Sequence, residues 1–107
     1  MPDVHLVWDG LPFWLELKVS KGTRVNISPH QIAWHMAYYA RGGASFFLVK
    51  RAKERDIVLF GGDQGPEVLE KGCSAPCVLR TCGPAHLFEG LRPILEARGP
   101  AGLRPAP

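Results

Sequence analysis

The chain has 107 residues, of which 46% are hydrophobic, and its formal net charge at pH 7 is +3. This length fits one domain with a modest core and does not fit two. No apolar stretch is long enough to span a bilayer, and no basic region followed by an apolar run opens the chain, so we expect a soluble intracellular protein with neither a membrane span nor a signal peptide. The small positive charge permits a polyanionic partner without requiring one.

The chain opens with a predicted β-hairpin. Residues 4–8 and 11–19 are rich in apolar, aromatic and β-branched side chains, and Asp9-Gly10 between them is a strong signal for a two-residue turn. With that turn, the numbers of paired residues add up to nineteen, so Asp3 faces Glu16 across the ladder. Alternation along the strands places seven apolar residues on one face, which must be covered: Val4, Leu6, Trp8, Leu11, Phe13, Leu15 and Leu17.

The other face of the hairpin carries Asp3, Glu16 and Lys18. Two carboxylates about 5 Å apart repel by roughly 3 kcal/mol at an effective dielectric constant near 20, and a sheet built only for stability would avoid this. A divalent cation between them would turn repulsion into coordination, and hard oxygen ligands suit Mg²⁺. Lys18 could then reach a metal-bound water or a phosphate oxygen. The alternatives are a solvated acid at residue 3 and an exposed polar strand edge at residues 16 and 18.

A helix is predicted from Pro29 to about Arg41. Ser28 is a good N-cap, proline is favoured at the first helical position, and Gln31 completes a capping box, while two glycines follow the helix. Helical spacing predicts a buried stripe made of Ile32, Ala33, Met36, Tyr39 and Ala40.

The remaining ring-bearing residues of this helix fall outside the stripe. Trp34 and Tyr38 could stack on nucleobases, join a dimer contact or pack under a neighbouring loop. His30 and His35 are interpreted as surface histidines without a catalytic role.

The second half of the chain alternates between apolar runs and loops. The predicted elements are a buried strand at 45–49, a strand at 56–60, a loop at 61–66, a short edge strand at 67–70 and a helix at 84–98 that covers the sheet. Pro93 should kink or split that helix, and residues 99–107, rich in proline, alanine and glycine, should form a disordered tail. The order of elements predicts an α/β fold with a mixed sheet over residues 1–98.

Two basic segments are candidate contacts for a phosphate backbone. Lys21 and Arg24 lie in the loop before the first helix, and Lys50, Arg51 and Lys53 follow the strand at 45–49. Simple solvation of these charges is the alternative for both segments.

Three cysteines and a histidine have the spacing C-x3-C-x4-C-x3-H, formed by Cys73, Cys77, Cys82 and His86. Zinc ribbons and knuckles prefer two residues between paired cysteines, and an odd number of cysteines does not suit a disulfide scaffold. We therefore expect reduced thiols.

Pro2-Asp3, twelve further residues and then Glu16-Leu17-Lys18 resemble the signature of the PD-(D/E)xK nuclease superfamily. The run from Ser28 to His35 resembles the helix that follows in its small phage-type members, which are related to VRR-NUC domains and Holliday junction resolvases. The resemblance covers about residues 2–51. It implies a restriction-endonuclease-like core and a Mg²⁺-dependent DNA endonuclease, with Mn²⁺ as a substitute metal, branched DNA as substrate and a homodimer as the working form. It also implies that the protein is located in the cytoplasm of a bacterial or phage-infected cell.

The resemblance further implies roles for individual residues. Asp3 and Glu16 bind the metal together with the Leu17 carbonyl, Lys18 assists the attacking water, and Gln31 supports the site or touches DNA. Members usually carry a helix before the Pro-Asp motif, whereas in this sequence only Met1 stands before it. We therefore expect that helix to be dispensable or to be replaced by a second subunit. A non-catalytic DNA-binding or assembly protein that keeps the nuclease fold is the alternative, and the intact acids and lysine favour the enzyme.

Overall fold

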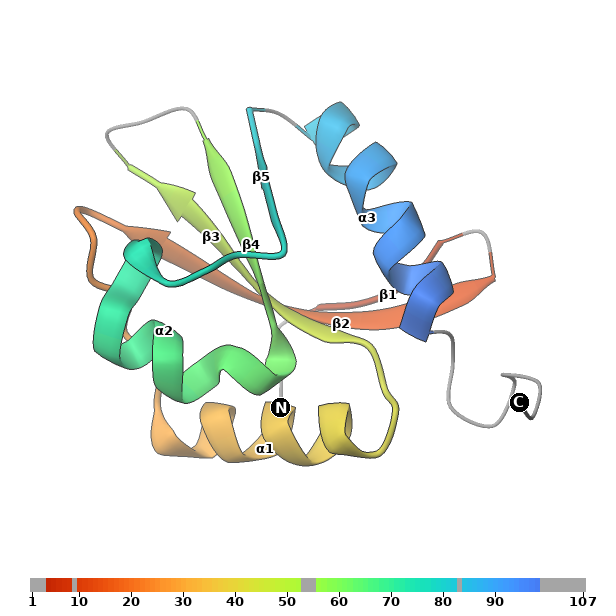
Figure 1. Ribbon diagram of the computed structural model, residues 1–107, viewed down its shortest axis with the longest axis horizontal. Coiled ribbons are helices and arrows are strands. Elements are labelled where there is room, and N and C mark those ends of the chain that lie inside the picture. The colour runs from red at the N-terminus through yellow and green to blue at the C-terminus, as the bar shows by residue number, and fades with distance from the viewer. Residues whose placement is uncertain (1–3, 9, 53–55, 83, 99–107) are drawn as a thin grey trace.

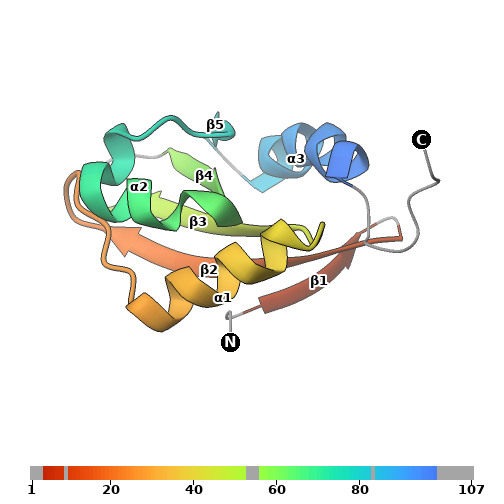
Figure 2. The same cartoon turned by 60° about the horizontal axis from the view of Figure 1, so that its bottom comes forward.

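The computed structural model describes residues 4–8, 10–52, 56–82 and 84–98. The predictions for Asp3, Lys53 and the tail at 99–107 lie outside these residues. One mixed sheet has the order β1-β2-β3-β4-β5, in which only β2 and β3 are parallel neighbours. Figures 1 and 2 show α1 and α3 on opposite sides of this sheet. The elements are β1 (Val4–Trp8), β2 (Leu11–Ser20), α1 (Pro29–Ala40), β3 (Ser45–Arg51), β4 (Ile57–Gly61), η1 (Gly62–Gln64), α2 (Gly65–Lys71), η2 (Gly72–Ser74), β5 (Leu79–Thr81) and α3 (Pro84–Arg98).

The predicted hairpin and its register are confirmed for the pairs that the structure describes. Val4 pairs with Leu15 and Trp8 with Leu11, so the residue numbers add up to nineteen, as expected. Gly10 has a φ of 79°, which glycine adopts without strain. The predicted apolar face packs against α3 in one cluster, whose fully buried members include Phe13, Leu91 and Leu95.

A second cluster fills the other face of the sheet. Phe47 and Val49 of β3, together with Val58 and Phe60 of β4, pack against α2 through Val68. Because alternate residues of β3 and β4 enter the two clusters, both strands are buried on both faces, as the continuous apolar run at 45–49 predicted.

The elements after β4 differ in part from the predicted ones. The loop expected at 61–66 and the edge strand expected at 67–70 are wrong, because residues 62–71 form η1 and α2. Pro66 lies in the first turn of α2, Gly65 and Val68 are buried, and the helix formers from Leu69 to Lys71 are exposed. The short strand β5 was not predicted. The predicted helix at 84–98 is confirmed as one helix with Pro93 inside it, so of the two effects expected of Pro93, the split does not occur.

The buried stripe predicted for α1 is also wrong. Ala33, Met36 and Ala40 are exposed, whereas His35 is fully buried and Ile32 packs against the second cluster. The hydrophobic pattern failed here because α1 lies over polar residues of β2, described below.

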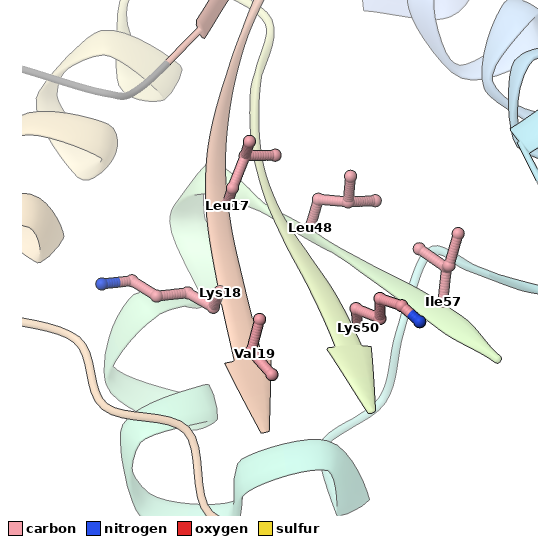
Figure 3. A pocket seen from close by; sticks show the side chains of 6 residues that line it. All are labelled: Leu17, Lys18, Val19, Leu48, Lys50 and Ile57. Atoms are coloured by element: carbon pink, nitrogen blue, oxygen red, sulfur yellow. The ribbon is translucent and has the colours of Figure 1, made fainter. Parts of the chain in front are cut away.

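The face of the sheet that α3 covers stays open at one end. Leu17 and Val19 have exposed fractions of 46% and 72%, and they line a hollow of about 290 Å³ with Leu48, Lys50 and Ile57 (Figure 3). Leu17 was predicted to lie on the covered apolar face; it is on that face but beyond the reach of α3.

Candidate functional site

The first turn of α1 is fixed by a capping box. The Ser28 hydroxyl accepts a hydrogen bond from the Gln31 backbone N–H at 3.2 Å, and the Gln31 side-chain oxygen accepts one from the Ser28 backbone N–H at 3.0 Å. This reciprocal pair, predicted from the sequence, satisfies two backbone donors that a helix start leaves without helical partners. It also holds the Gln31 side chain in one position.

The same Gln31 oxygen accepts a second hydrogen bond, from the Lys18 ammonium group at 2.9 Å. One turn further along α1, the ring of His35 lies 3.5 Å from the carboxylate of Glu16, measured from Nε2 to Oε1. Both contacts form because the spacing of the residues is similar along the two elements: two strand residues cover about 6.6 Å and four helix residues about 6 Å. Successive polar positions of β2 therefore meet successive turns of α1.

The Glu16 and His35 pair is almost completely removed from solvent. Both side chains are 1% exposed, and the His35 ring packs against Phe47 with a centroid separation of 4.4 Å. A carboxylate buried to this extent loses several kcal/mol of hydration, which partner groups must offset. Such a buried polar pair is weak evidence for stability and points to a functional role.

Sequence reasoning missed His35, which was interpreted as a surface residue. The signal that could have found it is its spacing from Gln31, because residues four apart lie on the same face of a helix. The prediction for His30 agrees with its exposed position.

The predicted metal ligands are only partly within the described chain. Glu16 and the Leu17 carbonyl belong to β2, whereas Asp3 lies outside the described residues. Among the residues that the structure describes, no group of three or more His, Cys, Asp or Glu side chains could hold a metal ion. The donors that fit an oxygen-preferring cation are therefore the Glu16 carboxylate and a neighbouring backbone carbonyl.

Aromatic rings continue the contact between β2 and α1 beyond Glu16. Trp34 stacks on Tyr38 with centroids 4.9 Å apart and planes 16° apart, and Trp14 and Trp34 form a T-shaped pair with centroids 5.7 Å apart. The ring of His5, in β1, also contacts the Trp14 ring, with the two centroids 4.5 Å apart. We call these four residues the aromatic run. Along β2, the site thus has the aromatic run on one side and, on the other, the loop that follows Ser20.

That loop carries two of the predicted DNA contacts. Lys21 and Arg24 are exposed and line a hollow of about 430 Å³. The loop backbone is anchored twice, because the buried Ser20 hydroxyl donates to the carbonyl oxygens of Gly22 and Arg24, and the Thr23 carbonyl accepts a hydrogen bond from the Cys73 N–H at 2.7 Å.

Of the other predicted DNA contacts, the two that the structure describes do not lie beside Lys18. Lys50 and Arg51 belong to β3 itself, and Lys50 lines the open apolar hollow on the opposite face from the Lys18 ammonium group (Figure 3). Arg51 forms an ion pair with Asp56 at 3.2 Å, and Arg80 binds the same carboxylate at 2.9 Å.

The cysteines lie in different environments. Cys73 is buried in the core, Cys77 is partly buried and Cys82 is exposed, and none of the three forms a disulfide among the described residues.

None of the helices described in the structure is long and apolar enough to cross a membrane. Comparisons of the chain with protein-family models, curated proteins and solved structures found no match.

Proposed function

We propose that the protein is a Mg²⁺-dependent DNA endonuclease that hydrolyses phosphodiesters, with a restriction-endonuclease-like core and branched DNA as its substrate. The observation that carries this proposal is the placement of Glu16 and Lys18 on one face of β2, each held by a residue of α1. The Lys18 amine is held by Gln31, and the neighbouring Glu16 carboxylate is buried beside His35. An acid and an amine in this arrangement fit metal-assisted hydrolysis better than they fit a structural role. The resemblance of the sequence to the PD-(D/E)xK signature supports the same reading.

The residues of the proposed site would have two different roles, metal binding and stabilisation of negative charge. Glu16, Asp3 and the Leu17 carbonyl would hold the metal, which supplies a water of lowered pKa and positive charge beside the phosphate when bound. Mn²⁺ has similar ligand preferences and would substitute. The Lys18 ammonium group, oriented by Gln31, adds a further positive charge where the transition state gains negative charge.

His35 would act as a positioning residue for Glu16. Its fully buried ring contacts both the carboxylate and Phe47, the cross-strand neighbour of Glu16, and would therefore restrict the rotation of Glu16. Groups that contact a metal ligand from behind commonly set its orientation. The predicted surface position of His35 is wrong, because its side chain is fully buried, and a positioning role is proposed for it here.

The exposed loop cations Lys21 and Arg24 would contact the phosphate backbone beside Lys18. A homodimer remains part of the proposal, and the open apolar hollow around Leu17 and Val19 supports it, since exposed apolar surface of this kind is typical of contact sites.

The test is a cleavage panel of duplex, single-stranded, flap and four-way junction DNA with Mg²⁺, and again with excess chelator. We expect cleavage of branched DNA that chelation stops and that Glu16→Gln lowers by at least a thousand-fold, about 4 kcal/mol in the activation free energy. Glu70→Gln, at an exposed residue of α2, is the matched control and should cut like the wild type. Full activity in Glu16→Gln would remove Glu16 from the site.

Binding of DNA without cleavage under any metal would favour the second candidate, a non-catalytic DNA-binding or assembly protein with a nuclease fold. The panel therefore separates the two candidates directly.

A further inference from the structure

The aromatic run is not part of the core that stabilises the fold. Trp14, Trp34 and Tyr38 are half-buried and His5 is exposed, and neither hydrophobic cluster described above includes any of the four. Ring contacts link the four residues to one another across β1, β2 and α1. A fold that needed these rings only for burial would place them against aliphatic side chains of the sheet.

The run has a hollow on its solvent side. Trp34 and Tyr38, one helical turn apart and nearly parallel, line a hollow of about 220 Å³ with Ala37 and Arg41. The hollow thus combines flat aromatic surface with an exposed guanidinium group. Gly43 leaves room for the Tyr38 ring, since a Cβ at that position would overlap the ring.

The run also reaches the proposed site. The Trp34 ring lies 5.2 Å from the ring of His35, which contacts Glu16, and Trp14 is two residues before Glu16 on the same face of β2. A chain crossing the site would therefore meet aromatic rings on one side and the cations Lys21 and Arg24 on the other.

We propose that the aromatic run is a stacking surface for unpaired nucleobases, and that the strand bound at the site is single-stranded where it crosses this surface. The inference rests on the proposed function, because it describes the substrate of that same site. An anionic chain with exposed aromatic faces matches both the rings and the flanking cations, and this combination is typical of proteins that bind single strands. Paired bases of a duplex are stacked on each other and offer no such face.

The test compares two labelled oligonucleotides of equal length, oligothymidylate and its abasic counterpart, by fluorescence anisotropy in excess chelator. Both carry the same phosphate charge, and only the first has bases. We expect oligothymidylate to bind at least five-fold more tightly to the wild-type protein, because each stacked base adds affinity in this range. Equal affinity for the two would overturn the proposal, and this comparison needs no variant.

Variants then locate the surface. Trp34→Ala and Tyr38→Leu should weaken oligothymidylate binding by roughly five-fold to a hundred-fold and leave abasic binding unchanged. Tyr38→Phe keeps the ring and should bind like the wild type. Met36→Ala, on an exposed face of the same helix, is the control for α1. Loss of both affinities together, in variants with wild-type circular dichroism, would place phosphate contacts there and contradict stacking.

The outcomes keep this inference separate from the nuclease proposal. Base-dependent binding without cleavage in the metal panel would refute the nuclease alone, whereas cleavage with equal affinity for both oligonucleotides would refute stacking alone. If Trp34→Ala instead converts a dimer to a monomer and leaves oligothymidylate binding intact, the run is a contact between copies of the chain and the inference is wrong.

Discussion

The three hydrogen bonds at Gln31 allow a prediction that does not depend on the proposed activity. Gln31→Ala removes the acceptor for the Ser28 N–H, a loss of about 1 kcal/mol for a cap, and the acceptor for the Lys18 ammonium group, worth about 1.5 kcal/mol at the lower end for a charged donor. Because Lys18 is half-exposed and water replaces part of that bond, we expect a total loss of about 2 kcal/mol in the free energy of unfolding. The melting temperature should then fall by about 10 °C, as measured by thermal denaturation.

Two further variants separate the contributions. Gln31→Glu retains an acceptor for both partners and should melt within a few degrees of the wild type. A double-mutant cycle of Gln31→Ala with Lys18→Met should give a coupling energy of about 1 kcal/mol, because each change removes the same hydrogen bond. Strictly additive losses would show that Gln31 does not hold Lys18, and the positioning of the amine would need another explanation.

Four other predictions have simple readouts. Lys18→Ala should lower turnover far more than metal affinity, and calorimetry that shows lost affinity with full turnover at saturating Mg²⁺ would contradict its role. Glu16→Gln should be at least as resistant to urea as the wild type without metal, since it removes a buried charge and keeps the shape; a loss above about 3 kcal/mol would mean that the carboxylate is structural. Gly72→Ala should cost about 2 kcal/mol, because φ is 61° and a Cβ would overlap a backbone carbonyl, whereas Gly22→Ala, with open space around it, should be nearly neutral in the same urea titration. Light scattering should show a dimer at micromolar concentration that Val19→Asp converts to a monomer, and a wild-type monomer would remove the dimer from the proposal.

Local signals were enough to predict the hairpin and the start of α1. The Asp-Gly pair set the register of β1 and β2, and Ser28 with Gln31 set the first turn of the helix, because in both cases the deciding interactions lie within a few residues. Glu16 and Lys18 were correctly expected to share a face of β2.

Contacts between distant segments were less predictable. The burial of His35 depends on Glu16, nineteen residues away in the sequence, and its pattern on the helix gives an apolar stripe that the structure does not follow. The edge strand predicted at 67–70 is part of α2, and this helix packs on α1, where Ile32 closely approaches Gly65, a contact that the local sequence does not indicate. Lys50 was predicted as a contact for a phosphate backbone, and β3 presents it on the face opposite the Lys18 ammonium group, which the sequence did not indicate.

The anchored loop after β2 has a consequence for the cost of binding. Hydrogen bonds from Ser20 and Cys73 hold the loop backbone from two sides, so Lys21 and Arg24 extend from a backbone whose conformation is largely fixed before any partner arrives. Fixing the backbone of one residue costs about 1–2 kcal/mol of conformational entropy. Since folding has already met this cost, a phosphate group that binds here has to order only the two long side chains, and more of the electrostatic attraction is retained as affinity.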